Sequence, residues 1–273
     1  KFWILVRYLQ LNEISDVNHY IKSSINIINV NYNFKKPFTK ISEKSNKYIE
    51  DCFNLSLKLI KVGKAHELIN GPISKKHFLK KKFPGITEYV ANKTNSKDPV
   101  MLIYNNNLSV SPLTTHLPIK SVSKHVKKRK IINNILKIDE FYRTKLKITP
   151  KIAILGLNPH CETISKISEE NNEIIPALRF LLKKKIKVIG PFAADTFFLK
   201  KNIKKFNVVV GMYHDQVLSP AKTLFEFNAI NITLGLPFIK ITPDHGPNYQ
   251  MVGKNKSDAS SIFYALSFLD KVR

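Results

Sequence analysis

The chain has 273 residues, of which 43% are hydrophobic and 24% charged, proportions typical of a folded globular protein that exclude a collagen-like repeat and a wholly disordered chain. Its 45 Lys and Arg outnumber its 20 Asp and Glu, so the net charge is +25 and anionic partners are favoured. The apolar runs are far shorter than the roughly 20 residues that a membrane-spanning helix needs, and two cysteines exclude a disulfide framework.

The positive charge comes almost entirely from lysine, since only five residues are Arg. Proteins that recognise nucleic acids usually use Arg for base contacts and aromatic residues for stacking. Here Lys accompanies Asn and Ile, as a strongly AT-biased genome would encode. We therefore expect a solvated basic surface that attracts anionic metabolites, rather than specific nucleic-acid binding or membrane binding. The chain begins with Lys, which suggests that the start of the gene product is missing, and the cysteine usage fits a reducing cytoplasm.

Short β-rich runs alternate with amphipathic stretches, a pattern typical of α/β proteins with a largely parallel sheet. The expected strands are 2–6, 101–104, 108–111, 151–155, 207–210 and 231–234. The expected helices are 47–61, 122–145, 173–184 and 257–272, the last capped by Ser257 or Asp258. Polar clusters follow several of these strands, where open α/β sheets bind ligands.

Three histidines each follow a predicted strand: His116, His160 and His214. The fold can therefore bring three imidazoles to one point, and neutral imidazoles suit zinc, cobalt or similar ions. Taken singly, a histidine is more often a hydrogen-bonded core residue. Two acids lie nearby in the sequence, Asp215 directly after His214 and Asp195 after a Gly-Pro turn. Such carboxylates can orient histidine ligands or accept protons, and Asp195 can equally cap a helix.

Five segments occur in an order that resembles one enzyme family. They are Leu155-Gly156-Leu157-Asn158-Pro159-His160, Gly190-Pro191-Phe192-Ala193-Ala194-Asp195-Thr196, Met212-Tyr213-His214-Asp215-Gln216, Asn231-Ile232-Thr233-Leu234-Gly235-Leu236-Pro237-Phe238-Ile239 and Asp244-His245-Gly246. Together with Gly71-Pro72-Ile73-Ser74-Lys75 and Thr114-Thr115-His116-Leu117-Pro118, they closely resemble the 4-hydroxythreonine-4-phosphate dehydrogenase (PdxA) family of vitamin B6 biosynthesis. The resemblance runs from about residue 66 to the end of the chain.

The resemblance implies a fold like that of isocitrate and isopropylmalate dehydrogenases, with two α/β/α domains and an active site in the interdomain cleft of a homodimer. We expect residues 1–88 with 257–273 to form the first domain, and residues 89–256 to form the second, which carries the metal ligands and the dimer interface. The implied reaction is the NAD- or NADP-dependent oxidation of 4-phosphooxy-L-threonine to 2-amino-3-oxo-4-phosphooxybutanoate. That product loses CO2 to give 3-amino-2-oxopropyl phosphate.

By resemblance, one divalent ion (zinc, magnesium or cobalt) is held by His116, His160 and His214, one of them donated across the dimer interface. The implied catalytic residues are Lys222, Asp215 and Asp195, and the substrate-binding residues are Thr87, Lys222, Asn231 and Lys240. A Gly-x-Gly-x-x-Gly fingerprint is absent from the sequence. In this fold group the dinucleotide lies along loops such as the one with Asp244, His245 and Gly246.

The sequence departs from the family pattern in four places. The family's Gly-Asp-Pro-Ala-Gly-Ile-Gly segment is missing, as a truncated N-terminus would explain. Ile86 replaces a histidine of the family's Gly-His-Thr-Glu, and Cys161-Glu162-Thr163-Ile164 replaces a Gly-rich continuation. Lys240 stands where Arg is usual, which exchanges a bidentate fork for a point charge. Cys161 is either a buried structural thiol or a group near the ion.

These departures leave the three histidines in place and leave the substrate open. One alternative is a dehydrogenase of a related phosphorylated acid, 4-phospho-threonate or 4-phospho-erythronate. Another is an inactive homologue that binds anions or RNA through its lysine-rich surface.

Overall fold

The structure is a computed structural model, which describes residues 8–11, 25–36, 39–80, 82–161, 167–226, 228–243, 246–247 and 249–272. The strand expected at 2–6 lies outside these residues. So do Asp244 and His245 of the expected cofactor loop.

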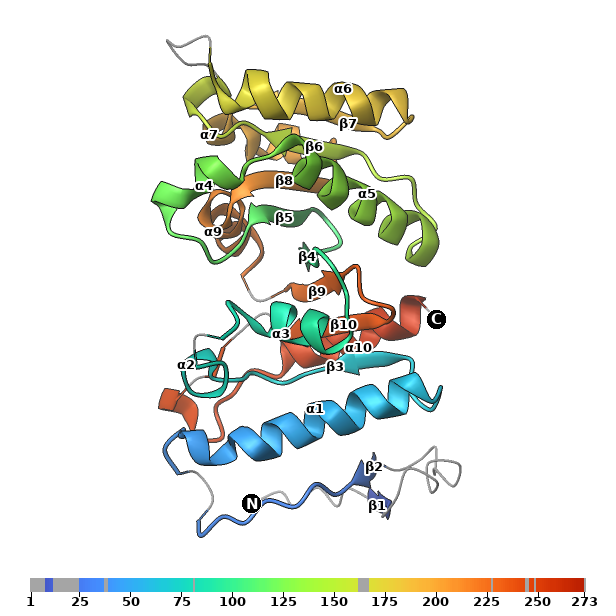
Figure 1. Cartoon of the computed structure of the whole chain (residues 1–273), viewed down its shortest axis with the longest axis vertical. Coiled ribbons are helices and arrows are strands. Elements are labelled where there is room, and N and C mark those ends of the chain that lie inside the picture. The colour runs from blue at the N-terminus through green and yellow to red at the C-terminus, as the bar shows by residue number, and fades with distance from the viewer. Residues whose placement is uncertain are drawn as a thin grey trace.

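An eight-stranded sheet runs through the molecule in the order β3-β10-β9-β4-β5-β8-β6-β7 (Figure 1). Its strands are β3 (Glu67–Ile69), β4 (Val100–Tyr104), β5 (Ser109–Thr114), β6 (Ile152–Leu155), β7 (Val188–Phe192), β8 (Val208–Tyr213), β9 (Ile230–Leu234) and β10 (Ile239–Pro243). A separate parallel pair, β1 (Tyr8–Leu11) and β2 (Ile25–Ile28), lies beyond α1 (Asn46–Lys61) in Figure 1. The chain therefore has a mixed α/β fold.

The expectation of a largely parallel sheet was wrong. The pairs β3–β10, β5–β8, β8–β6 and β6–β7 are parallel, but β10–β9, β9–β4 and β4–β5 are antiparallel. The physical reason for one of these pairs is the three-asparagine turn at 105–107, where the Asn107 backbone N–H donates to Asn105 Oδ1 at 2.8 Å. A turn this short can join only antiparallel neighbours. The strand pair predicted around this turn is confirmed.

The helices that surround the sheet agree with most of the expected ranges. They are α1, α2 (Lys75–Phe78), α3 (Ile86–Lys93), α4 (Ile119–His125), α5 (Lys128–Lys145), α6 (Ile175–Lys183), α7 (Ala194–Phe197), α8 (Lys200–Ile203), α9 (His214–Phe225) and α10 (Ser260–Val272). Short 3-10 turns lie at Glu43–Ser45, Pro159–Cys161 and Tyr249–Met251, and a π-helix at Glu170–Ile174 leads into α6. At the start of α10, Asp258 Oδ1 accepts the Ser260 backbone N–H at 2.8 Å, as its predicted capping role requires.

The single helix expected at 122–145 is wrong, because the chain breaks between α4 and α5. Val126, which ends α4, has an extended backbone (φ −78°, ψ 96°) and is completely buried in the core. A new helix then begins at Lys128, whose backbone N–H donates to Glu173 Oε2 at 2.6 Å. The carboxylate from another element thus satisfies one of the free N–H groups of the new helix end.

Alternate residues of the central strands point to opposite faces of the sheet and join two different apolar clusters. Ile152 and Ile154 of β6 pack with α4, α5, α6 and α10, whereas Ala153 and Leu155 pack with α7 and α9. Because strand side chains alternate with a period of two, both faces of a doubly covered sheet must be apolar.

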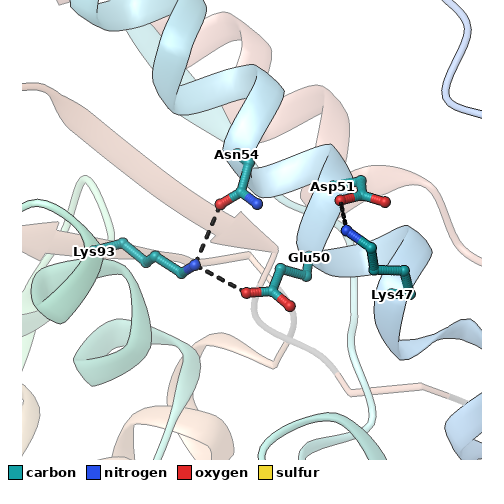
Figure 2. Close-up of polar contacts among 5 residues, drawn as sticks. All are labelled: Lys47, Glu50, Asp51, Asn54 and Lys93. Atoms are coloured by element: carbon teal, nitrogen blue, oxygen red, sulfur yellow. Dashed lines mark hydrogen bonds and ion pairs between the residues drawn. The ribbon is translucent and has the colours of Figure 1, made fainter.

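A third apolar cluster joins the β3 end of the sheet to α1 and α3. Phe53 of α1 contacts Tyr89 of α3 edge-on, with ring centroids 5.3 Å apart. On the surface beside this contact, Lys93 Nζ donates to Glu50 Oε1 at 2.9 Å and to Asn54 Oδ1 at 3.3 Å (Figure 2). Exposed ion pairs of this kind add little stability. The aromatic contact therefore contributes more than the ion pair to the packing of α1 against α3.

None of the described helices is both long enough and apolar enough to cross a membrane. The two predicted domains each contribute strands to the one large sheet, β3 from residues 1–88 and the remaining seven from 89–256. The domain division stays a prediction.

Packing on both faces of β6 predicts a large cost for truncating one of its core side chains. Ile154 is fully buried, so Ile154→Ala should lower the free energy of unfolding by about 2–5 kcal/mol. Ile189, on the neighbouring strand β7, is 55% exposed, so Ile189→Ala is the matched control and should cost about 1 kcal/mol or less. Urea denaturation of both variants checks this, and equal costs would contradict the assigned core.

Candidate active site

Half of the site residues predicted from the sequence line one cavity of about 260 Å³. It lies where the carboxyl ends of β5 and β8 meet the start of α3 and strands β9 and β10. Its wall includes six of the predicted site residues: Thr87, His116, His214, Asn231, Lys240 and Gly246. The remaining wall is largely apolar, as is usual for a small-molecule site.

His116 and His214 lie side by side in this cavity, with ring centroids 5.9 Å apart. His116 comes two residues after β5, and His214 is the first residue of α9, directly after β8. Since β5 and β8 are parallel neighbours, their carboxyl ends share one edge of the sheet and place both rings there. His214 Nδ1 lies 2.6 Å from Asp215 Oδ1, an arrangement that leaves the other ring nitrogen, Nε2, for a further partner.

Lys75 of α2 contacts His116 across the cavity mouth, with Lys75 Nζ 3.0 Å from His116 Nε2. Although His116 is an exposed residue, partial desolvation by the surrounding walls, followed by the charges of Lys75 and His214, lowers its pKa to about 4. The ring is therefore neutral at physiological pH. Nε2 of a neutral ring can accept a hydrogen bond from the Lys75 ammonium group.

His160 lies apart from this pair. It is in the 3-10 turn after β6, with a left-handed backbone (φ 56°), and its side chain is 74% exposed. Its Nδ1 is 3.8 Å from Asp195 Oδ2, so Asp195 faces His160 as Asp215 faces His214. A single chain thus joins two of the three predicted metal ligands and presents the third outward.

Lys240 is almost completely buried, with 1% of its surface exposed. Its Nζ donates to Thr242 Oγ1 at 2.6 Å, and Thr242 Oγ1 donates to Asn70 Oδ1 at 3.0 Å. Burial lowers the pKa of Lys240 to about 7, against the opposing effect of Glu88 and with a further contribution from Lys75. Lys240 can therefore carry or release a proton near neutral pH.

Two further predicted residues present polar atoms at the cavity. Asn231 Oδ1 is buried and accepts no hydrogen bond from the described residues, although it lines the cavity. Such an atom is expected to meet water or a ligand. Thr87, in the first turn of α3, has its hydroxyl 3.3 Å from that of Thr233.

Lys222 does not line this cavity. It lies two turns beyond His214 on α9 and lines a narrow neighbouring cavity whose wall shares Ile103 and Leu218 with the first. Of the expected cofactor loop, Gly246 reaches the wall of the site cavity.

The donor set fits a divalent ion only in part. His116 and His214 offer two nitrogens of the right type, one of them in a ring kept neutral by its surroundings. Within the residues that the structure describes, no three His, Cys, Asp or Glu side chains come close enough to hold an ion.

Sequence reasoning missed three contributors to the site: Lys75, Asn70 and Thr242. Lys75 ends the Gly71–Lys75 segment, which was recognised without a role. Asn70 and Thr242 give no local signal, because each matters only through the hydrogen-bond chain from Lys240 across adjacent strands. Pairing between β3 and β10, distant in sequence, creates that chain.

Comparison with known proteins gives a consistent result. The pattern of the family described as "Pyridoxal phosphate biosynthetic protein PdxA" matches residues 3–269. The 4-hydroxythreonine-4-phosphate dehydrogenase of Sulfurihydrogenibium sp. is 39% identical over 262 residues, which are 94% of this chain and 80% of the relative. That of Aquifex aeolicus is 40% identical over 213 residues, 76% of this chain and 65% of the relative, so less than two thirds of its length is spanned.

Solved structures agree with the sequence comparison. The 1.25 Å crystal structure of 4-hydroxythreonine-4-phosphate dehydrogenase from Klebsiella pneumoniae matches with a TM-score of 0.82 and 25% identity, covering 98% of this chain and 84% of that chain. The enzyme of the same name from Burkholderia phymatum matches with a TM-score of 0.76 and 28% identity, covering 96% of this chain and 80% of that chain.

Burial of the Lys240 amine predicts a pH-dependent stability. With a folded pKa of about 7 and an ordinary unfolded value near 10.4, the unfolded state binds more protons than the native state between these limits. The stability due to this group therefore rises with pH from about 7 to about 10. Lys240→Met should be more stable than the parent chain near pH 6, and this advantage should shrink toward pH 10. Urea unfolding across this range checks the trend, and a constant difference would contradict it.

Proposed function

The chain belongs to the PdxA family, and from that premise we propose that it oxidises 4-phosphooxy-L-threonine with NAD or NADP and a divalent metal ion. The product, 2-amino-3-oxo-4-phosphooxybutanoate, then loses CO2 to give 3-amino-2-oxopropyl phosphate for pyridoxal 5'-phosphate synthesis. The observation that carries the proposal is the pairing of neutral His116 with His214 in a cavity that also contains Lys240, Asn231 and Thr87.

The metal is proposed to be held by His116 and His214 of one chain and by His160 of the partner subunit. The exposure of the His160 side chain, 74%, supports this division, as does the lack of a third close ligand within the described residues. The active site is then shared between two copies in a homodimer. Asp215 holds the Nδ1 side of His214 at 2.6 Å, which leaves Nε2 for a ligand, and Asp195 lies 3.8 Å from Nδ1 of His160, where it would have to move closer to orient that ring.

The substrate is proposed to bind along the wall that joins α3 to β9 and β10. Thr87 lies in the first turn of α3, where free backbone N–H groups favour a phosphate. Asn231 Oδ1 is the buried acceptor for a substrate hydroxyl or ammonium group. Lys240, with a pKa of about 7, can neutralise an anionic group or take up a proton beside it.

The ion, when bound, supplies Lewis-acid charge beside the reacting hydroxyl, and the dinucleotide supplies the hydride acceptor. The protein's part is to position the groups and to move the proton. Lys222, predicted to take this proton or to bind the substrate, lies along α9 from His214. Gly246, at the cavity wall, together with Asp244 and His245, is proposed to bind the dinucleotide.

The cavity is proposed to be the cleft between two α/β/α domains, arranged as in isocitrate and isopropylmalate dehydrogenases. Lys75, Gly85 and Thr87 come from the predicted first domain, residues 1–88 with 257–273. His116, His214 and Lys240 come from the predicted second domain, residues 89–256. The presence of both groups in one wall supports this assignment, and closure of the cleft would exclude water from the reacting groups.

The replacement of the family histidine by Ile86 favours a second candidate substrate. Ile86 is 8% exposed, packs in the apolar cluster of α1 and α3, and can donate no hydrogen bond to a ligand. A dehydrogenase of 4-phospho-threonate or 4-phospho-erythronate would retain the same metal and hydride chemistry. An inactive homologue that binds anions or RNA would require neither the metal ion nor hydride transfer.

The first test is NADH or NADPH formation from 4-phosphooxy-L-threonine, followed by absorbance with and without a chelator. We expect turnover that the chelator abolishes and that added zinc, magnesium or cobalt restores. His214→Ala should lower turnover by more than about 100-fold, because a metal ligand is lost. His125→Ala, on the exposed surface of α4, is the control and should leave turnover unchanged.

Three other outcomes of this assay are informative. Turnover only with 4-phospho-threonate or 4-phospho-erythronate would move the assignment to the second substrate class. Turnover that survives exhaustive chelation would overturn the metal assignment. Salt-sensitive RNA retention with no turnover on any of these acids would favour the inactive homologue.

The shared site predicts complementation between two inactive variants. In a heterodimer of the His160→Ala and His214→Ala chains, one site keeps all three histidines and the other loses two. Random reassociation makes about half of the dimers heterodimeric, so about one quarter of the parental activity should return. Mixing after denaturation and refolding, with each variant refolded alone as the control, checks this. No recovery, despite heterodimers detected by differential tagging, would show that His160 does not act across subunits.

A further inference from the structure

The loop after β6 is held by hydrogen bonds to a buried carboxylate, that of Glu170. This residue has no role in the function proposed above. Glu170 is 1% exposed, and its Oε1 accepts the backbone N–H groups of Leu157 at 2.7 Å and Asn158 at 2.9 Å. Its Oε2 accepts Asn158 Nδ2 at 2.7 Å. Both oxygens of one carboxylate therefore hold the two residues that precede Pro159 and His160.

A second contact ties the same loop to the neighbouring strand and helix. Gln216, two residues after His214 on α9, donates from Nε2 to the Gly156 carbonyl at 2.7 Å. Its Oε1 accepts the backbone N–H of Met212 at 2.6 Å. The Gln216 amide thus links the loop that carries His160 to the end of β8, which carries His214.

Gly156 is required for this close approach. A Cβ atom at this position would lie 3.1 Å from Glu170 Oε1 and 2.7 Å from Cys161 Sγ. The loop then turns through left-handed backbone at His160 and Cys161 (φ 56° and 60°), conformations that are costly for residues other than glycine. External contacts must hold such a turn, and the N–H groups upstream of it are bonded to Glu170.

A carboxylate suits this position better than a neutral amide. Three N–H donors converge on Glu170, and an ionised carboxylate has only acceptor sites to offer them. Such charge-assisted bonds are shorter and stronger than neutral ones. Glutamine would replace one acceptor oxygen with an N–H2 group facing a donor, while it keeps nearly the same volume.

We propose that Glu170 is a positioning residue that, together with Gln216, fixes the loop after β6 so that His160 is presented as a metal ligand. The proposal deepens the proposed function, because it rests on His160 being a ligand. Glu170 acts through the backbone and side chain of Asn158 and does not touch substrate, cofactor or ion. The link through Gln216 also fixes the spacing of the His160 and His214 loops within one chain.

The test measures zinc affinity by competition with a chromophoric chelator, on the full chain in its native oligomeric state. Glu170→Gln should weaken zinc binding by about 10–100-fold, as loss of a group that orients a metal ligand does. Glu173→Gln is the matched control. It lies on the same π-helix but contacts Lys127 and Lys128, so zinc affinity should change less than about twofold. Circular dichroism melting confirms that each variant is folded.

A double-mutant cycle separates positioning from general stability. If Glu170 acts through His160, Glu170→Gln should cause no further loss of zinc affinity in the His160→Ala chain. An equal loss in both backgrounds would overturn the proposal, as would unchanged affinity in Glu170→Gln alone. If His160→Ala itself leaves zinc affinity unchanged, the ligand assignment of the proposed function fails, and the positioning role fails with it.

A second variant keeps the test decisive if Glu170→Gln does not fold. Asn158→Ala removes the contacts of Asn158 Nδ2 with Glu170 and Glu169 but leaves both backbone bonds to Glu170 in place. Zinc affinity should then fall by a smaller factor, about 3–10-fold, again only while His160 is present. Unchanged affinity in a folded Asn158→Ala chain would overturn the proposal.

Discussion

The site depends on the parallel pairing of β5, β8 and β6 at the centre of the sheet. Parallel strands end at the same edge, so the residues that follow them lie along that edge although they are far apart in sequence. His116, His160 and His214 each follow one of these strands. Packing on both faces holds the strands in register, because Val208 and Val210 face one apolar cluster and Val209 faces the other. A one-residue slip would exchange these faces and move the histidine loops.

The site is also defined by a high density of basic groups around one small cavity. Lys75, Lys240, His116 and His214 all reach its wall. Desolvation lowers the pKa of His116 to about 4 and that of Lys240 to about 7, which reduces the positive charge gathered at the cavity near physiological pH. An anionic substrate or a divalent ion would alter this balance directly. The chain's general positive charge, in contrast, is spread over exposed lysines.

Much of the secondary structure could be predicted from local sequence. The helix at Asn46–Lys61 and the strands at Val100–Tyr104, Ile152–Leu155 and Ile230–Leu234 appear close to their expected ranges, because periodicity reports which side chains are buried. The error at 122–145 has a long-range cause. Glu173, which is distant in sequence, caps the helix that begins at Lys128, and this contact is not visible in the local pattern.

The sequence by itself determined the family, the three histidines and the strand ends from which they project, since these depend on local motifs and their order. The tertiary structure decided which of them meet: His116 with His214 at 5.9 Å, and His160 exposed beside Asp195. It also decided that Lys240 is buried against Thr242 and that Glu170 holds the loop after β6. Proximity between distant segments is set by strand pairing and packing, and burial then sets pKa values and hydrogen-bond partners. A linear pattern contains neither quantity.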